Sequence, residues 1–244
     1  MLAVLIHVGQ TPNVEPFGMN PIFSDGTFKF VKIYIDPPRS PADPTYEELG
    51  VGDLVPYEYR NLSAFNSPEF ETLTYNHIKR PGEGKVYEKL RQEGGFLLFY
   101  STLFYNGTKP PENKEISEKK GAYIIGYFGI EGIYADYELF VDPKLQRRFK
   151  ANGQLGRFDK TGDRSGADWW ISGSTGGLLS NAVPLTKPED SQKWNEFSRN
   201  NLTTPTGKPL SNYTIARYDS TLVCPSQNLL SLRKWIQDFS DVQI

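Results

Sequence analysis

The run Gly94-Gly95-Phe96-Leu97-Leu98-Phe99-Tyr100 and a second run, Tyr123-Ile124-Ile125-Gly126-Tyr127-Phe128, decide the fold class of this chain of 244 residues. Both runs are short, rich in aromatic and β-branched residues, and marked by glycine. This pattern is typical of buried strands and not of a helix. We therefore predict two central strands, at 96–104 and 122–134.

Further strands are expected on both sides of this centre. Residues 2–8 form a short apolar run that predicts another buried strand. Asp25-Gly26 stands between one apolar segment and an alternating apolar series, which predicts a hairpin over 21–35. Residues 167–172 predict a strand that ends in a glycine-rich turn at 173–177.

Helix signals are fewer and irregularly spaced. Residues 83–93 carry apolar side chains at helical spacing, and Gly94 stands where a left-handed cap residue ends such a helix. Thr186-Lys187-Pro188-Glu189 has the form of a capping box and predicts the start of a helix that carries Trp194. An apolar stripe over 227–240 predicts an amphipathic helix packed on the body. Together these signals favour an α+β fold, with a mixed curved β-sheet or small barrel and peripheral helices.

Composition excludes several classes of protein. The chain is 38% hydrophobic and shows no shift in composition, so we expect one domain over 1–244. A net charge of −2 and a pI of about 5.8 exclude a generally basic protein that coats nucleic acid, but not a local basic patch. The single cysteine excludes an internal disulfide. The apolar opening is too short for a membrane span and lacks the basic flank of a signal peptide, so we expect a cytoplasmic protein with no membrane partner.

The familiar catalytic signatures are absent. There is no phosphate loop and no dinucleotide-binding glycine motif. His7, His77 and Cys224 cannot build the zinc site of a nucleobase deaminase, and no metal is expected. A histidine-activated nucleophile would have to use His7 or His77, although a lone histidine is more often structural. Ile35-Asp36-Pro37-Pro38 is similar to a methyltransferase motif, but Arg39 replaces its aromatic residue, which favours a proline-rich loop.

A basic segment gives the best sign of a ligand. Residues 144–164 hold seven cations against two carboxylates, a local net charge of +5 in a chain of −2. Such a segment is expected where a phosphate backbone lies, although a solvated loop explains it equally well. Its cations include Arg147, Arg148, Lys150 and Arg157.

Two tryptophans follow this segment and could stack on a base. Because side chains alternate along a strand, only one of Trp169 and Trp170 is expected to face the core. The other would be exposed and able to stack on an extruded base.

Several separate stretches resemble the nucleotide modification-associated domain family of the third type. They are Asn20–Thr27, Thr45–Glu48, Pro68–Tyr75, Phe96–Phe104, Tyr123–Tyr134 and Gly176–Leu185. The resemblance implies a protein that acts on or recognises modified bases, with DNA or a nucleotide as its partner. It implies no agreed mechanism and no particular cofactor. The chain departs from the family at Tyr75-Asn76-His77-Ile78, where a turn of the Gly-Asp-Pro type is expected.

An enzyme and a non-catalytic reader are the competing classes, with a structural or protein-interaction module as a third. The two central strands also resemble those of base-binding barrels of the PUA and EVE type, which capture a flipped base without chemistry. If the protein is an enzyme, Asp25 and Tyr100 are the acid–base candidates. Asp25 stands at a hairpin end and Tyr100 at the end of a central strand, although a tight turn and a core position explain them equally well.

Overall fold

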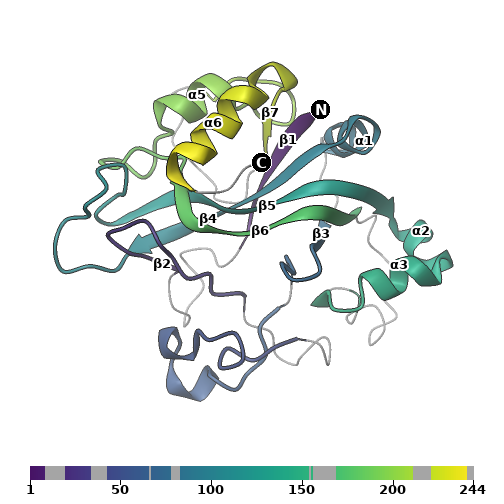
Figure 1. Cartoon of the computed structure of the whole chain (residues 1–244), viewed down its shortest axis with the longest axis horizontal. Coiled ribbons are helices and arrows are strands. Elements are labelled where there is room, and N and C mark those ends of the chain that lie inside the picture. The colour runs from purple at the N-terminus through teal and green to yellow at the C-terminus, as the bar shows by residue number, and fades with distance from the viewer. Residues whose placement is uncertain are drawn as a thin grey trace.

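The computed structural model describes residues 1–8, 20–33, 43–65, 67–77, 83–153, 155, 169–210 and 221–240. Its centre is a mixed sheet of seven strands in the order β3-β6-β5-β4-β1-β7, with β2 paired beside β4 (Figure 1). The strands are β1 Leu2–His7, β2 Asn20–Ile22, β3 Thr74–His77, β4 Gly95–Tyr105, β5 Lys120–Ala135, β6 Trp169–Pro184 and β7 Leu222–Cys224.

Long antiparallel strands form the middle of the sheet, and parallel pairs flank them. β4, β5 and β6 are antiparallel neighbours, which confirms the two predicted central strands. β1 and β2 both pair parallel with the same edge of β4, β1 at residues 95–100 and β2 at residues 103–105. β3 and β7 stand at opposite ends of the strand order, so the curved sheet is open. The predicted α+β fold with a mixed, curved sheet is confirmed, and its small-barrel form is not adopted.

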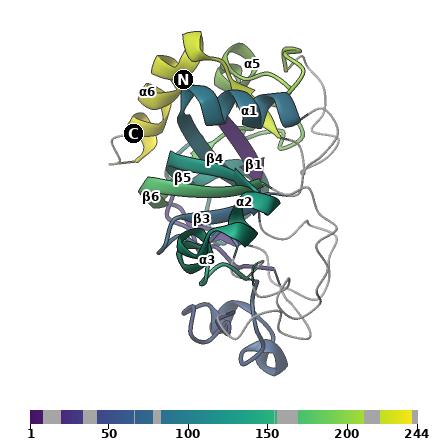
Figure 2. The ribbon, with the colours of Figure 1, turned by 90° about the vertical axis from the view of Figure 1, so that its right-hand side faces the viewer.

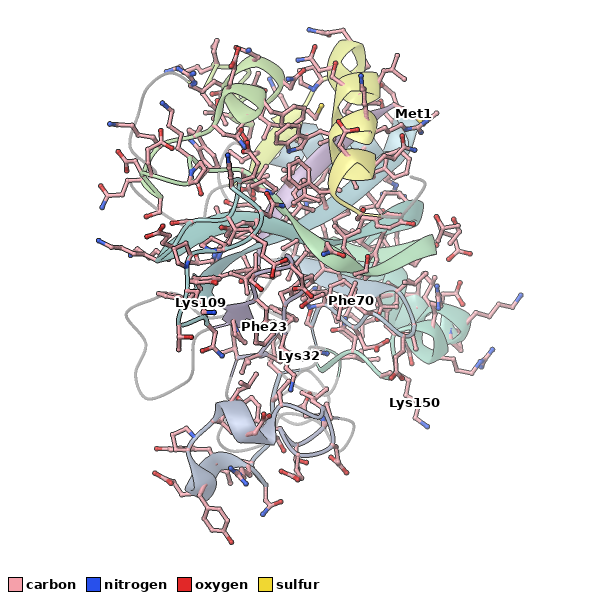
Figure 3. All side chains as sticks on the ribbon, turned by 60° about the vertical axis from the view of Figure 1, so that its left-hand side comes forward. Met1, Phe23, Lys32, Phe70, Lys109 and Lys150 are labelled. Carbon is pink, nitrogen blue, oxygen red and sulfur yellow. The ribbon has the colours of Figure 1, made fainter. Side chains whose placement is uncertain are left out.

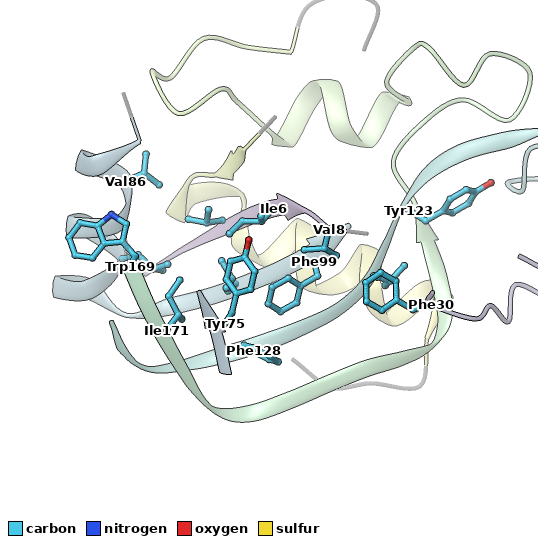
Figure 4. Close-up of a cluster of buried hydrophobic side chains, with 14 of the residues drawn as sticks. Ile6, Val8, Phe30, Tyr75, Val86, Phe99, Tyr123, Phe128, Trp169 and Ile171 are labelled. Carbon is cyan, nitrogen blue, oxygen red and sulfur yellow. The ribbon is translucent and has the colours of Figure 1, made fainter. Parts of the chain in front are cut away.

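Alternation along the strands divides the core between the two faces of the sheet. On β1, Leu2, Val4 and Ile6 face one cluster, and Ala3 and Leu5 face the other. The first cluster lies on the concave side, where Figure 4 shows rings from β3, β4, β5 and β6 gathered together. Burial on both faces explains why the central strands are apolar at almost every position.

Five helices cover this sheet in the described part of the chain. α1 Gly84–Glu93 packs on the first cluster, while α5 Glu196–Asn201 and α6 Leu229–Phe239 lie over the second (Figures 1 and 2). α2 Asp136–Val141 and α3 Pro143–Arg148 lie at one end of β5 and β6. Gly94 ends α1 at the predicted position, but its φ of 68° and ψ of 177° lie outside the left-handed helical conformation that was predicted for it. None of the helices in the described ranges is long and apolar enough to cross a bilayer.

A small lobe extends from the concave side. It spans residues 43–65 and contains the short 3₁₀ helices η1 Gly52–Leu54 and η2 Tyr57–Tyr59; a third, η3 Ser226–Asn228, precedes α6. A cluster of its own, with Tyr46 fully buried, packs against Val31 of the main body. The lobe is therefore attached through the segment that follows β2.

Two segments differ from their predictions. The hairpin turn forms at Asp25-Gly26, but its ladder is one bridge long, Ile22 with Phe28, because Val31 N–H donates to Asn20 Oδ1 instead. Residues 34 and 35 of that prediction lie outside the described residues. The predicted helix start at Thr186 is wrong, because its hydroxyl accepts from Ala122 N–H in the sheet, and α5 begins after Asn195, which caps Ser198 N–H.

The glycine-rich stretch 173–177 is not a turn. β6 runs through it for 16 residues, beside β5. A side chain at Gly176 would lie 2.1 Å from the Tyr127 carbonyl oxygen, so glycine allows the two strands to approach there. The glycines that suggest a turn in the sequence instead allow the backbones of β5 and β6 to approach each other closely.

Candidate functional site

A chain of three hydrogen-bonding side chains lies at the concave side of the sheet. Tyr75 and His77, two residues apart on β3, point to the same side of that strand, and Glu83 immediately precedes α1. His77 Nε2 lies 2.8 Å from Glu83 Oε2, and His77 Nδ1 lies 3.3 Å from the Tyr75 hydroxyl. None of the three residues is more than 8% exposed. We call this arrangement the Tyr75–His77–Glu83 chain.

Aromatic rings hold the chain in place. The His77 ring stacks on Tyr87 with centroids 4.9 Å apart, and Tyr87 stacks on Trp169 at 6.2 Å. The edge of Tyr75 meets Phe99 at 5.2 Å (Figure 4). Packing of this kind restricts the rotamers of the polar side chains, and a catalytic constellation needs that restriction.

The two ring nitrogens of His77 have different partners. In a neutral imidazole one ring nitrogen donates and the other accepts, so an imidazole whose Nε2 donates to the Glu83 carboxylate can accept from the Tyr75 hydroxyl at Nδ1. Hydrogen bonds thus connect a phenol, an imidazole and a carboxylate in that order, in which an imidazole can act as a base and a carboxylate can orient it. This arrangement can take a proton from the phenol or return it.

A second group of buried charges lies where the small lobe meets the body. Lys32 is 8% exposed, and Asp43 and Glu69 are buried beside it. Burial lowers the pKa of the Lys32 ammonium to about 8, and the carboxylates of Glu69, Glu71 and Asp43 oppose that shift. We call these four residues the Lys32 cluster. A lysine with such a pKa has a much larger neutral fraction at neutral pH than an ordinary lysine.

Hydrogen bonds hold the Glu69 carboxylate and the Lys32 backbone in place. Glu69 accepts hydrogen bonds from the backbone N–H groups of Glu71 and Thr72 and from the Thr72 hydroxyl. The Tyr46 hydroxyl donates to the Lys32 carbonyl at 3.0 Å. Figure 3 shows Lys32 between the small lobe and the sheet.

The comparison with protein families agrees with the resemblance in the sequence. The model of the family described as nucleotide modification associated domain 3 matches residues 3–221. The chain belongs to this family. No curated protein and no solved structure matches it. Membership in the nucleotide modification associated domain 3 family associates the protein with nucleotide modification and names no mechanism.

The acid–base candidates from the sequence do not meet in this member of the nucleotide modification associated domain 3 family. Asp25 is exposed, and its carboxylate accepts from the Thr27 N–H and hydroxyl, which lowers the pKa of Asp25. Tyr100 is fully buried in the second cluster, with the His7 ring 5.2 Å away. Asp25 lies in the turn that follows Ile22, and Ile22 pairs with Tyr105 of β4. Tyr100 is separated from Tyr105 by about 16 Å along the same strand, at about 3.3 Å per residue.

The expectation of one exposed tryptophan is wrong. Trp169 and Trp170 do face opposite sides of β6, but both are buried, at 5% and 0% exposure. Trp169 packs in the first cluster beside Tyr87, whereas Trp170 packs under α3 against Phe149 and donates to Asp136 Oδ1 at 2.6 Å. Alternation separates the two rings correctly, but α2 and α3 cover the face that was expected to be open.

The basic segment divides into exposed and engaged cations. Arg147 and Lys150 are exposed, and Figure 3 shows Lys150 extending outward. Arg148 donates to the Gly173 carbonyl at 2.8 Å and lies 3.5 Å from Glu131, so it fastens α3 to β6. Arg157 lies outside the described residues.

The remaining candidates from the sequence offer little chemistry. Burial raises the pKa of the Cys224 thiol to about 12, so the reactive thiolate is scarce at neutral pH. No cluster of metal-ligating side chains occurs within the described ranges. His77 is a candidate from the sequence alone, whereas Tyr75, Glu83 and the Lys32 cluster emerge only from the structure. One available signal was the departure from the family pattern at 75–78, which coincides with the Tyr75–His77–Glu83 chain.

Proposed function

We propose that this protein is an enzyme that modifies nucleotides or nucleic-acid bases, and that Tyr75, His77 and Glu83 transfer a proton in that reaction. The observation that carries the proposal is the hydrogen-bonded order of phenol, imidazole and carboxylate in a buried site, in a chain that belongs to a family associated with nucleotide modification. Tyr75 is the group that meets the substrate, His77 is its proton acceptor, and Glu83 is a positioning residue.

Physical chemistry favours an enzyme over a reader. A buried imidazole and carboxylate lose solvation, and a protein that only binds a base has no need of them. The two rings that the sequence suggests for a reader, Trp169 and Trp170, are both buried, although Tyr137 on α2 is 68% exposed. A non-catalytic reader therefore remains the alternative that the experiment must exclude.

The test is mass analysis of nucleosides after incubation of the protein with nucleotides and with modified and unmodified DNA. The wild-type protein should produce a new nucleoside. Tyr75→Phe and His77→Gln should lower the rate by about 10²–10⁴-fold, the usual contribution of a positioned acid or base. Glu83→Gln should lower kcat more than it changes KM, because Glu83 acts through His77.

Tyr105→Phe is the matched control. It also removes a tyrosine hydroxyl that donates one hydrogen bond, in this case to the Lys109 carbonyl at 2.6 Å, outside the site. Its activity should equal that of the wild type. Retention of modified DNA without any new nucleoside would support the reader instead. Full activity in Tyr75→Phe would exclude the proposed role of the Tyr75–His77–Glu83 chain in proton transfer.

A further inference from the structure

The surface of α2 and α3 combines an exposed apolar face, which includes one aromatic ring, with positive charge. On α2, Tyr137 and Val141 lie four residues apart on one face, and they are 68% and 77% exposed. Lys144 and Arg147 lie on α3, and Lys150 follows the helix. All three side chains are exposed. We call these five residues the α2–α3 surface.

The carboxylates of the same region each contact another group of the protein. Glu131 lies near Arg148, Asp136 accepts from Trp170, Glu138 binds Arg91 of α1, and Asp142 caps the Lys144 N–H of α3. By contrast, within the described ranges no carboxylate lies at ion-pair distance from Lys144, Arg147 or Lys150. The positive charge of the α2–α3 surface is thus left for an external anion.

The platform under this surface is rigid. Phe149 and Trp170 pack edge to face at 5.4 Å beneath α3, and Leu139 of α2 is buried in the same cluster. The Arg91 to Glu138 ion pair, at 2.7 Å, ties α2 to α1. An exposed tyrosine on a rigid platform loses little conformational entropy when a ring stacks on it.

We infer that the α2–α3 surface binds single-stranded DNA, with Lys144, Arg147 and Lys150 contacting phosphates and Tyr137 stacking on a base. Cations spaced along a surface beside an exposed ring are the means by which proteins hold an unpaired strand. The inference rests on the proposed function and names its substrate class, since it makes the target a base within a polynucleotide and not a free nucleotide.

The experiment measures binding of a fluorescein-labelled single-stranded oligonucleotide by anisotropy over a series of salt concentrations. Binding needs no turnover, so its failure would leave the catalytic role of Tyr75 untouched. The variant Lys144→Ala/Arg147→Ala/Lys150→Ala should weaken binding and lower the slope of log Kd against log salt by about 2, because each phosphate contact on a single strand contributes about 0.7. Tyr137→Ala should weaken binding about 10-fold and leave that slope nearly unchanged.

The matched control is Lys109→Ala/Lys114→Ala/Lys119→Ala, which removes the same charge from three exposed lysines between β4 and β5. It should bind as the wild type does. Circular dichroism should show that all variants remain folded. The inference would be overturned if the slope of log Kd against log salt were the same in the wild type and the triple variant of the α2–α3 surface. It would also be overturned if the control variant lost as much affinity as that triple variant. It would also be overturned if the wild type bound vesicles rich in phosphatidylserine but no oligonucleotide.

Discussion

Lys32 should make the stability of the fold rise with pH in a narrow alkaline window. Burial lowers the pKa of this lysine from 10.5 to about 8 in the folded protein. Below pH 8 the ammonium is charged in both the folded and the unfolded states, and the cost of burying it is fully present. Between pH 8 and 10.5 the folded state releases the proton while the unfolded state keeps it, so stability increases with pH. The whole interval corresponds to about 3 kcal/mol.

Two other groups limit the window in which this rise can be observed. Burial raises the pKa of Cys224 from 9.0 to about 12 and that of Tyr123 from 10.0 to about 12. Each of these groups stays protonated in the folded state while it loses its proton in the unfolded state, so each lowers stability above its unfolded pKa. Below pH 9 their effect is small, and the contribution of Lys32 between pH 8 and 9 is about 1 kcal/mol.

The assay is urea denaturation, followed by tryptophan fluorescence, of the wild type and Lys32→Met at several pH values across this window. The wild type should gain about 1 kcal/mol relative to the variant, which corresponds to a difference in midpoint of roughly 0.3–1 M urea. Lys29→Met is the control for loss of a positive charge, because Lys29 lies in the same segment in an exposed ion pair with Asp53. Parallel curves for the wild type and Lys32→Met would refute the argument that this buried amine releases its proton near pH 8.

Five further substitutions test the packing by the same denaturation measurement. Gly95→Ala should cost at least about 3 kcal/mol, because Gly95 has a φ of 149° and a Cβ there would lie 1.9 Å from the Leu2 carbonyl oxygen. Gly94→Ala, at a φ of 68° and a ψ of 177° with no atom within 4 Å, should lower the free energy of unfolding by about 1–3 kcal/mol. Arg148→Ala should cost about 1–3 kcal/mol because the Gly173 carbonyl loses a charged donor, whereas exposed Arg147→Ala should change stability by less than about 0.5 kcal/mol. Asp25→Ala should lower the free energy of unfolding by about 1 kcal/mol, because two hydrogen bonds from Thr27 are lost. A large loss of activity in a variant that remains folded would support Asp25 as an acid–base residue.

The parts of the fold that depend on local sequence were predictable. The apolar runs at 96–104 and 122–134 correspond to β4 and β5, because strand preference and burial are both expressed in consecutive residues. α1 and α6 likewise follow from apolar spacing, and the end of α1 follows from Gly94. The capping box at Thr186 gave a wrong prediction because its hydroxyl accepts a hydrogen bond from Ala122 N–H in the sheet. These two residues are 64 positions apart, and local sequence patterns carry no information on such a contact.

The candidate site depends on contacts between distant segments and was therefore missed. Lys32 and Glu69 lie on separate segments that meet only through the tertiary fold. His77 and Glu83 are six residues apart, but their contact requires both the path of β3 and the position of α1. For Trp169 and Trp170, alternation predicts opposite faces correctly, but it cannot show that helices cover both.

The position of β1 between β4 and β7 has a consequence for how the protein folds. Residues 2–7 pair with residues 95–100 on one side and with residues 222–224 on the other. The sheet therefore joins segments from near the two ends of the sequence, and such distant pairing slows folding. Until β7 docks, β1 is an edge strand with unpaired N–H and C=O groups, which can pair with the same strand of another molecule. Deletion of the segment from β7 onward should therefore yield a protein that aggregates through β1.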